Sequence, residues 1–206
     1  MQKLVQKVLR YLKAKGKSLD EVEFVVLDLE LTGLDPKAHE IVSAAWVTMR
    51  SDRIQLKSAR HIINSDVKQL EQSPVFHGID EQTLSEGVSL KTLMTELCDV
   101  LHGKVLVCHN AYLDWGFIRL NSKALGLEAL PLAIVDTMQI EKRRQLKQNT
   151  ELHQDSLILA NCRSRYQLPD YEVHNALIDA LATAELLLVL TNKIGAGKPL
   201  KLSVLM

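Results

Sequence analysis

Residues 23–50 of the chain read EFVVLDLELTGLDPKAHEIVSAAWVTMR. Two runs rich in β-branched and other apolar residues, 24–31 and 41–49, flank a segment in which GLDP has the composition of a turn. After a second turn, residues 53–63 form a third run of the same kind. Short turns between successive strands favour antiparallel pairing, so we predict an antiparallel meander of three strands.

The hydrophobic pattern changes after this meander. Helical periodicity appears at 88–103, 111–126, 156–168 and 175–194, and short apolar runs typical of buried strands occupy 104–110 and 132–137. Strands that alternate with helices pair in parallel with their neighbours. We therefore predict an α/β fold with a mixed five-stranded sheet flanked by helices.

Size, charge and cysteine content set limits on the class of protein. The chain has 206 residues, of which 47% are hydrophobic, and this is enough for one core in one domain. Lys plus Arg equals Asp plus Glu at 25 each, so net charge favours neither nucleic acid nor membrane as a partner. The three Cys form no CxxC pair, and the longest apolar run is too short to cross a bilayer. We expect a cytoplasmic protein with reduced thiols and no membrane contact.

The first 20 residues differ from the rest. Their apolar residues recur at helical spacing, with Lys and Arg on the opposite face, which is typical of an amphipathic helix with one solvated side. We interpret residues 1–20 as an N-terminal helical extension and residues 21–206 as the main domain. We hypothesise that the extension packs back on that domain.

Asp28 and Glu30 are two residues apart in the first predicted strand, so their side chains leave the same face. Their neighbours are apolar, and two adjacent carboxylates repel each other and are costly to bury. A divalent cation is the usual compensation. The alternative is a strand at the edge of the sheet with both acids in water.

Two similar hexapeptides, HNAYLD at 109–114 and HNALID at 174–179, each precede an apolar helical segment. Asn is a preferred helix N-cap, so each hexapeptide places an Asp in the first turn of a helix and a His just outside it. Ordinary capping explains either hexapeptide taken singly. With the strand pair, however, Asp114 and Asp179 complete an oxygen-rich set of the kind that binds Mg²⁺ or Mn²⁺.

DLELTG, HNAYLD and HNALID, in this order, resemble the three motifs of the DEDDh superfamily of DnaQ-like 3′–5′ exonucleases. This superfamily includes the proofreading epsilon subunit of bacterial DNA polymerase III. FHGID at 76–80 and VDT at 135–137 are similar to further family segments, and the resemblance extends from about residue 24 to about residue 190.

The resemblance implies a ribonuclease H-like fold and a metal-dependent exonuclease that releases nucleoside 5′-monophosphates from the 3′ end of single-stranded or frayed DNA. It implies that two Mg²⁺ or Mn²⁺ ions are held by Asp28, Glu30, Asp114 and Asp179, and that His174 is the general base. It also assigns substrate-binding positions to Leu31, Thr32, Gly33, His77, His109 and Asn110. The family often has Thr where this chain has Leu31.

Other interpretations remain open at this point. The same motifs occur in RNA-trimming exonucleases of the oligoribonuclease and RNase T kind, so RNA 3′ ends are an alternative substrate. A non-catalytic nucleic-acid-binding or polymerase-docking subunit is a second alternative, which the complete set of acids and the His argue against. For Trp115 and Phe117 we favour core packing over base stacking, and for the basic run 141–147 a solvated helix face over phosphate contact.

Overall fold

The computed structural model describes residues 12, 14–70, 73–148, 151–153, 155–171 and 175–206, with the side chains of Phe76 and His77 excepted. The strands are β1 (Glu23–Leu31), β2 (Ile41–Arg50), β3 (Arg53–Ile63), β4 (Val105–Cys108) and β5 (Ala133–Asp136). The α-helices are α2 (Pro74–His77), α3 (Glu81–Ser85), α4 (Leu90–Leu101), α5 (Ala111–Ala124), α6 (Thr137–Lys147), α7 (Leu159–Ser164) and α8 (Ala176–Gly195). Two short 3₁₀ helices, Leu19–Glu21 and Leu202–Val204, complete the set.

The five strands form one mixed sheet in the order β3-β2-β1-β4-β5. β1, β2 and β3 pair antiparallel, while β4 pairs in parallel with β1 and with β5. The predicted meander and the predicted parallel strands are therefore confirmed. β1 lies at the centre of the sheet, which excludes the alternative of an edge strand with both acids in water.

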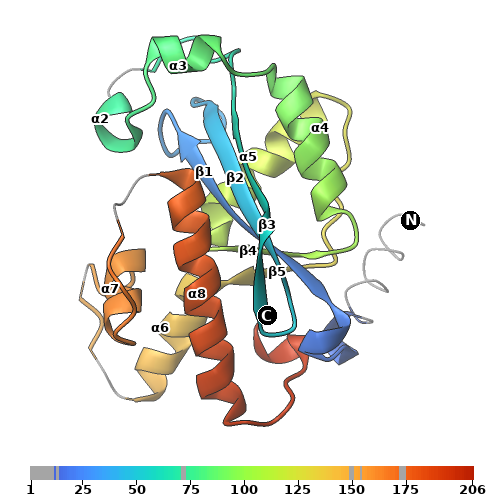
Figure 1. Ribbon diagram of the computed structural model, residues 1–206, viewed down its shortest axis with the longest axis vertical. Coiled ribbons are helices and arrows are strands. Elements are labelled where there is room, and N and C mark those ends of the chain that lie inside the picture. Colours follow the sequence, from blue (N-terminus) through green and yellow to red (C-terminus); the bar gives the residue numbers. More distant parts are fainter. Residues whose placement is uncertain (1–11, 13, 71–72, 149–150, 154, 172–174) are drawn as a thin grey trace.

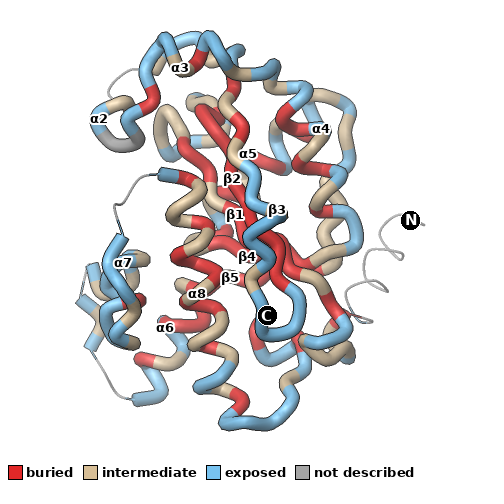
Figure 2. The backbone as a smooth tube through the Cα atoms, in the orientation of Figure 1, coloured by how far each residue is buried: buried red, intermediate tan, exposed pale blue. Residues whose placement is uncertain are grey.

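Helices cover the two faces of the sheet, with α8 on one face and α4 and α5 on the other (Figure 1). Side chains alternate along β1 accordingly. Phe24 and Val26 pack in the cluster that includes α8, whereas Val25 and Leu27 pack in the cluster with α4 and α5. β1, β2 and β4 are almost entirely buried, whereas the edge strand β3 is exposed along most of its length (Figure 2). A strand buried on both faces must be apolar throughout, which explains the nearly continuous apolar run at 24–31.

The helix predicted at 156–168 is wrong in length, because α7 covers only Leu159–Ser164. Before it, the Ser156 hydroxyl accepts from the His153 N–H and the Asn161 amide donates to the Asp155 carbonyl. Such side-chain bonds to the backbone compete with helix. The short helices α2 and α3 were not predicted.

The N-terminal extension can be assessed only at its end, since most of its predicted helix lies outside the described residues. Ala14 is buried in the α8-side cluster. The Leu19 N–H donates to the Leu200 carbonyl, and the Leu202 N–H donates to the Lys17 carbonyl. Residues 14–19 thus pack against the C-terminal segment. No helix among the described residues is long and apolar enough to cross a membrane.

Candidate active site

Asp28, Glu30 and Asp179 bring one carboxylate oxygen each into a group whose members all lie within 4.8 Å of one another. Asp28 and Glu30 continue the face of β1 that packs toward α8, because the side-chain period of a strand is two. Asp179 lies in the first turn of α8. The fold therefore brings together three of the predicted metal ligands, two from β1 and one from α8.

Local structure fixes both sides of this group. Glu30 pairs with Ser43 and Leu31 pairs with Ile41, so Val42 is an extra residue on β2 and forms a bulge beside the acids. On the helix, the Asn175 side chain accepts from the Leu177 and Ile178 N–H groups, which confirms its predicted role as N-cap.

Glu30 is only 9% exposed, and its Oε1 atom has no hydrogen-bond partner among the described residues. Burial, and next the charge of Asp179, raise the pKa of Glu30 to about 7. For Asp28, burial and then the charges of Asp114, Glu30 and Asp179 raise the pKa well above its ordinary value. An acid without a partner beside further acids is costly, and a bound cation removes that cost.

Asp114 lies in the first turn of α5 and is buried. Burial raises its pKa to about 7, while hydrogen bonds from its own backbone, from the Cys108 thiol and from the Leu29 backbone act in the opposite direction. Its charge is the second cause of the raised pKa of Asp28, so it adjoins the group on the side of that residue. The four predicted acids therefore form one continuous acidic region, which suits hard divalent cations bound by oxygen ligands.

Asn110 begins α5 but does not cap it with its side chain, so this part of the capping prediction is wrong. The residue has a positive φ of 77°, outside the extended region that a capping residue typically adopts. Asp136 takes the role instead. Its carboxylate accepts from the N–H groups of Asn110 and Ala111, at 3.3 and 3.0 Å, and from that of Gln139 at the start of α6.

His109 was predicted to bind substrate, and the structure shows both of its ring nitrogens engaged with protein atoms. Nε2 donates to the Leu157 carbonyl at 2.7 Å, and Nδ1 lies 2.9 Å from the Thr137 hydroxyl. Burial lowers the pKa of the imidazole. A neutral His with both nitrogens bonded ties the start of α5 to the α6–α8 connection and has no free nitrogen for a nucleotide.

The remaining substrate candidates form a loop that leaves β1 directly beside the acids. Thr32 closes this loop, because its hydroxyl accepts from the Glu40 N–H at 2.9 Å. At Gly33 an added Cβ would lie 2.3 Å from the His39 ring, so a larger residue there would require this ring to move. Leu31 is half-buried against the α4 and α5 side of the core.

Two predicted residues cannot be placed. His174 lies outside the described residues, and of His77 the structure describes the position at the end of α2 but not the side chain. Phe117 is fully buried and Trp115 packs against the same core, which confirms core packing for this pair.

Some residues around the site were not predicted from the sequence. Asp136, at the end of a strand and directly before a helix, carried a recognisable capping signal. Tyr112, in the first turn of α5, is 90% exposed, and Leu34 in the loop after β1 is 76% exposed. No pattern in the sequence indicated that these two side chains would be exposed.

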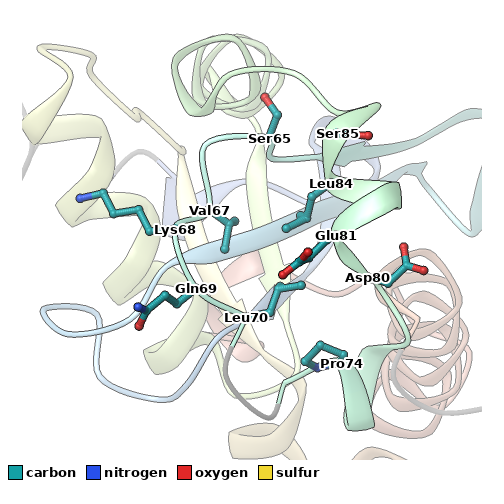
Figure 3. Close-up of a pocket in the computed structure, with 10 residues that line it drawn as sticks. All are labelled: Ser65, Val67, Lys68, Gln69, Leu70, Pro74, Asp80, Glu81, Leu84 and Ser85. Carbon is teal, nitrogen blue, oxygen red and sulfur yellow. The ribbon is translucent and has the colours of Figure 1, made fainter.

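A separate hollow of about 680 Å³ lies between the segment after β3 and α3. Figure 3 shows Glu81 and Leu84 of α3 facing Val67 and Leu70 across it, while Lys68 points away. None of its ten lining residues belongs to the acidic region. Because Glu81 would repel a phosphate, we assign no part of a nucleotide to this hollow.

Comparison with known proteins agrees with this site. The RNase_T family model, described as an exonuclease, matches residues 25–187. The chain belongs to this exonuclease family. The match includes the acids at 28, 30, 114 and 179, so the resemblance to the DEDDh exonucleases is confirmed.

Curated relatives include the PolC-type DNA polymerase III of Thermotoga petrophila, which is 29% identical over 94% of this chain and 14% of its own length. The corresponding protein of Caldanaerobacter subterraneus is 28% identical over 84% of this chain and 12% of its own length. The chain therefore spans about one seventh of the curated relatives that it matches.

Solved structures show the same fold. Escherichia coli exonuclease I in complex with a dA16 oligonucleotide superposes with a TM-score of 0.68 at 14% identity, over 84% of this chain and 41% of that chain. Exonuclease X in complex with 5′ overhanging duplex DNA gives 0.63 at 21% identity, over 84% and 93%. Cell-death related nuclease 4 gives 0.70 at 16% identity, over 83% and 64%. The fold is therefore that of the ribonuclease H-like exonucleases, as predicted.

Proposed function

We propose that this chain is a metal-dependent 3′–5′ exonuclease that releases nucleoside 5′-monophosphates from single-stranded or frayed DNA ends. One observation carries the proposal above all. Glu30 has a buried oxygen without a partner among the residues that the structure describes, and one carboxylate oxygen each of Asp28, Glu30 and Asp179 lie within 4.8 Å of one another. A divalent cation satisfies such a group without protonating it.

Asp28, Glu30 and Asp179 would hold a divalent cation, and Asp114, next to Asp28, would share in holding a second, as Mg²⁺ or Mn²⁺. Bound cations of this kind neutralise charge that develops on a phosphodiester during hydrolysis. The chain's own residues perform the rest. Asn175 fixes the helix start that carries Asp179, and Asp136 fixes the helix start that carries Asp114. His174 would accept the proton of the attacking water.

DNA is the proposed substrate because two structural neighbours were solved with DNA strands, and because the curated relatives are DNA polymerases. The exposed Tyr112 and Leu34 offer apolar surface for bases beside the acids. A polymerase partner is consistent with relatives in which this region is about one seventh of the chain.

The test uses 5′-labelled single-stranded DNA and RNA of one sequence, each incubated with the protein in Mg²⁺, in Mn²⁺ and in chelator. We expect a metal-dependent ladder that shortens from the 3′ end, faster on DNA, and absent with Asp179→Asn. Faster shortening of RNA would favour the RNA-trimming alternative. No shortening of either strand by folded protein with metal would refute the exonuclease and leave a binding or docking subunit.

A further inference from the structure

The outer face of α5 carries one aromatic residue and two cations. Tyr112, Arg119 and Lys123 are all exposed. Because residues seven or eleven positions apart in a helix differ by only about 20° in direction, these three side chains line one stripe, which we call the α5 stripe. It begins in the first turn, which also carries Asp114 on the buried side of the helix, and it extends about 16 Å to the last turn.

The loop after β1 lies beside the first half of the α5 stripe. Gly116 follows Tyr112 by four residues and so faces the same side of α5. A Cβ added to Gly116 would lie 3.1 Å from the Pro36 side chain of this loop. Lys37, the next residue of the loop, is exposed. Since the loop leaves β1 directly after Glu30 and Leu31, the loop and the stripe form one surface that starts at the acidic region.

The cations of the α5 stripe are not paired with acids. Neither Arg119 nor Lys123 forms an ion pair within the part of the chain that the structure describes. They are four residues apart, where like charges destabilise a helix, and Asp114, the one acid of α5, lies on the buried side. The C-terminal end of α5 favours a cation, which accounts for Lys123 but not for Arg119. A polyanion along the stripe would remove the repulsion.

Tyr112 is not explained by folding either. It is 90% exposed, and its hydroxyl forms no hydrogen bond with the described residues. By contrast, Tyr166 and Tyr171 each donate to a glutamate. An exposed aromatic ring gains free energy when it stacks on a base, whichever base it is. The bases of a duplex already stack on their neighbours, so such a ring favours single-stranded DNA.

We infer that the α5 stripe, with Lys37 beside it, binds the single-stranded DNA on the 5′ side of the nucleotide that is released. Tyr112 stacks on a base next to the acidic region, and the cations contact phosphates farther along the helix. The stripe has the length of about five nucleotides at a stacked spacing of about 3.4 Å. The inference rests on the proposed function, because that function places the 3′ end at the acids. It adds the path of the strand and a preference for single strands over duplex.

The experiment measures the binding of a fluorescein-labelled decathymidylate by anisotropy, with Asp179→Asn as the parent of every variant so that no DNA is cleaved. Arg119→Gln/Lys123→Gln should bind about ten-fold more weakly at about 0.1 M salt. The slope of log Kd against log salt concentration should fall by about 1.4, or about 0.7 for each phosphate contact. The matched control is Arg53→Gln/Lys57→Gln, which removes the same charge from exposed positions four residues apart on β3. β3 is the edge strand farthest from β5, against which α5 packs, so the control should keep the slope of the parent.

The role of the tyrosine is tested separately. Tyr112→Ala should weaken binding of the decathymidylate about ten-fold without a change in the salt slope, because stacking releases no counterions. Tyr112→Phe should bind like the parent, since it keeps the ring. Both variants and the parent should bind a blunt duplex alike, because its base faces are covered. The substituted positions are exposed, so the melting temperatures should stay within about 3 °C of the parent.

Unchanged binding of the decathymidylate by Arg119→Gln/Lys123→Gln or by Tyr112→Ala would overturn the inference. If the protein with Asp179 intact still cleaves DNA in that case, the proposed function stands. An equal loss of affinity in the β3 control would also overturn the inference, since any loss of positive charge would then be enough. Binding that depends on the α5 stripe, without cleavage by the protein with Asp179 intact, would support the path of the strand and refute the exonuclease.

Discussion

Two buried glutamates in this molecule have opposite surroundings. Within the described part of the chain, Glu30 in β1 has an unpartnered oxygen and acids for neighbours. Glu141 in α6 is fully buried and accepts from the Tyr166 hydroxyl at 2.6 Å and the Gln145 amide at 2.7 Å, with Arg165 at 3.5 Å. A buried acid that is surrounded by donors serves the fold, whereas one that lacks them is held ready for a ligand.

The largest expected effect is a loss of exonuclease activity, which we expect for a substitution at Glu30 and not at Glu141. Glu30→Gln keeps the size of the side chain and removes one charge from the acidic group. Loss of a metal ligand that is worth several kcal/mol should reduce exonuclease activity by about 10³-fold. In chelator the variant should melt at or above the temperature of the wild type, because repulsion with Asp28 and Asp179 is reduced. A lower melting temperature in chelator would contradict a repulsive site.

The same substitution at the other glutamate should instead lower stability and leave activity nearly unchanged. Glu141→Gln leaves Arg165 without its acid and places two amides side by side with Gln145. Breaking a buried ion pair costs about 3 kcal/mol, which urea denaturation at 25 °C can measure. Activity per folded molecule should stay within about two-fold of the wild type. A thousand-fold loss of activity here would erase the distinction between the two regions.

Metal binding provides a readout without substrate. Mn²⁺ at a free concentration of 100 times its Kd should stabilise the wild type by about 2.7 kcal/mol. Glu141→Gln should gain the same amount, while Glu30→Gln should gain much less at equal concentration. Thermal melts across a Mn²⁺ titration measure this, and equal stabilisation of all three proteins would place the cation elsewhere.

The stability of the protein should depend on pH, because the pKa values of Glu30 and Asp114 are both raised to about 7. Both lie above the ordinary values of these groups, so the folded protein binds protons more tightly than the unfolded chain does. Metal-free protein should therefore gain stability as the pH falls from about 8 toward 5, by on the order of 2 kcal/mol. With saturating metal the sign should reverse, because protons displace the cation from the same oxygens. Urea denaturation at pH 8 and pH 5, each with metal and with chelator, measures these changes in stability. A metal-free protein that is less stable at pH 5 than at pH 8 would contradict the prediction.

The surroundings of Glu30 could be predicted from the sequence, whereas those of Glu141 could not. Asp28 and Glu30 stand out because acids are rare in an apolar strand, and their shared face follows from the period of two. Glu141 lies in a basic run that was interpreted as solvated. Its burial depends on Tyr166 and Arg165, which come from another part of the chain, and no local pattern encodes such a contact.

The same reasoning applies to the fold. The five strands and their antiparallel or parallel pairing were predictable because each strand has its own apolar run and each turn its own composition. The capping of α5 was predicted incorrectly, because Asp136 lies 25 residues from Ala111 in the chain and reaches it only through the parallel pairing of β4 with β5. The contacts of His109 depend on Leu157 in the same way, 48 residues away.

The smallest expected effect concerns two tyrosines that each donate a hydroxyl to a glutamate. Tyr166→Phe removes the bond to Glu141 and the bond that the hydroxyl accepts from Arg144, but Glu141 keeps Gln145 and Arg165. It should cost about 1 kcal/mol of stability and no activity. Tyr171→Phe removes the bond to Glu185 and should change stability less, because Tyr171 is 40% exposed. Denaturation and single-turnover rates on the two variants test whether each tyrosine serves its own region. If Tyr166→Phe slowed cleavage with unchanged stability, the Glu141 network would belong to the catalytic site, and the contrast between the two glutamates would fail.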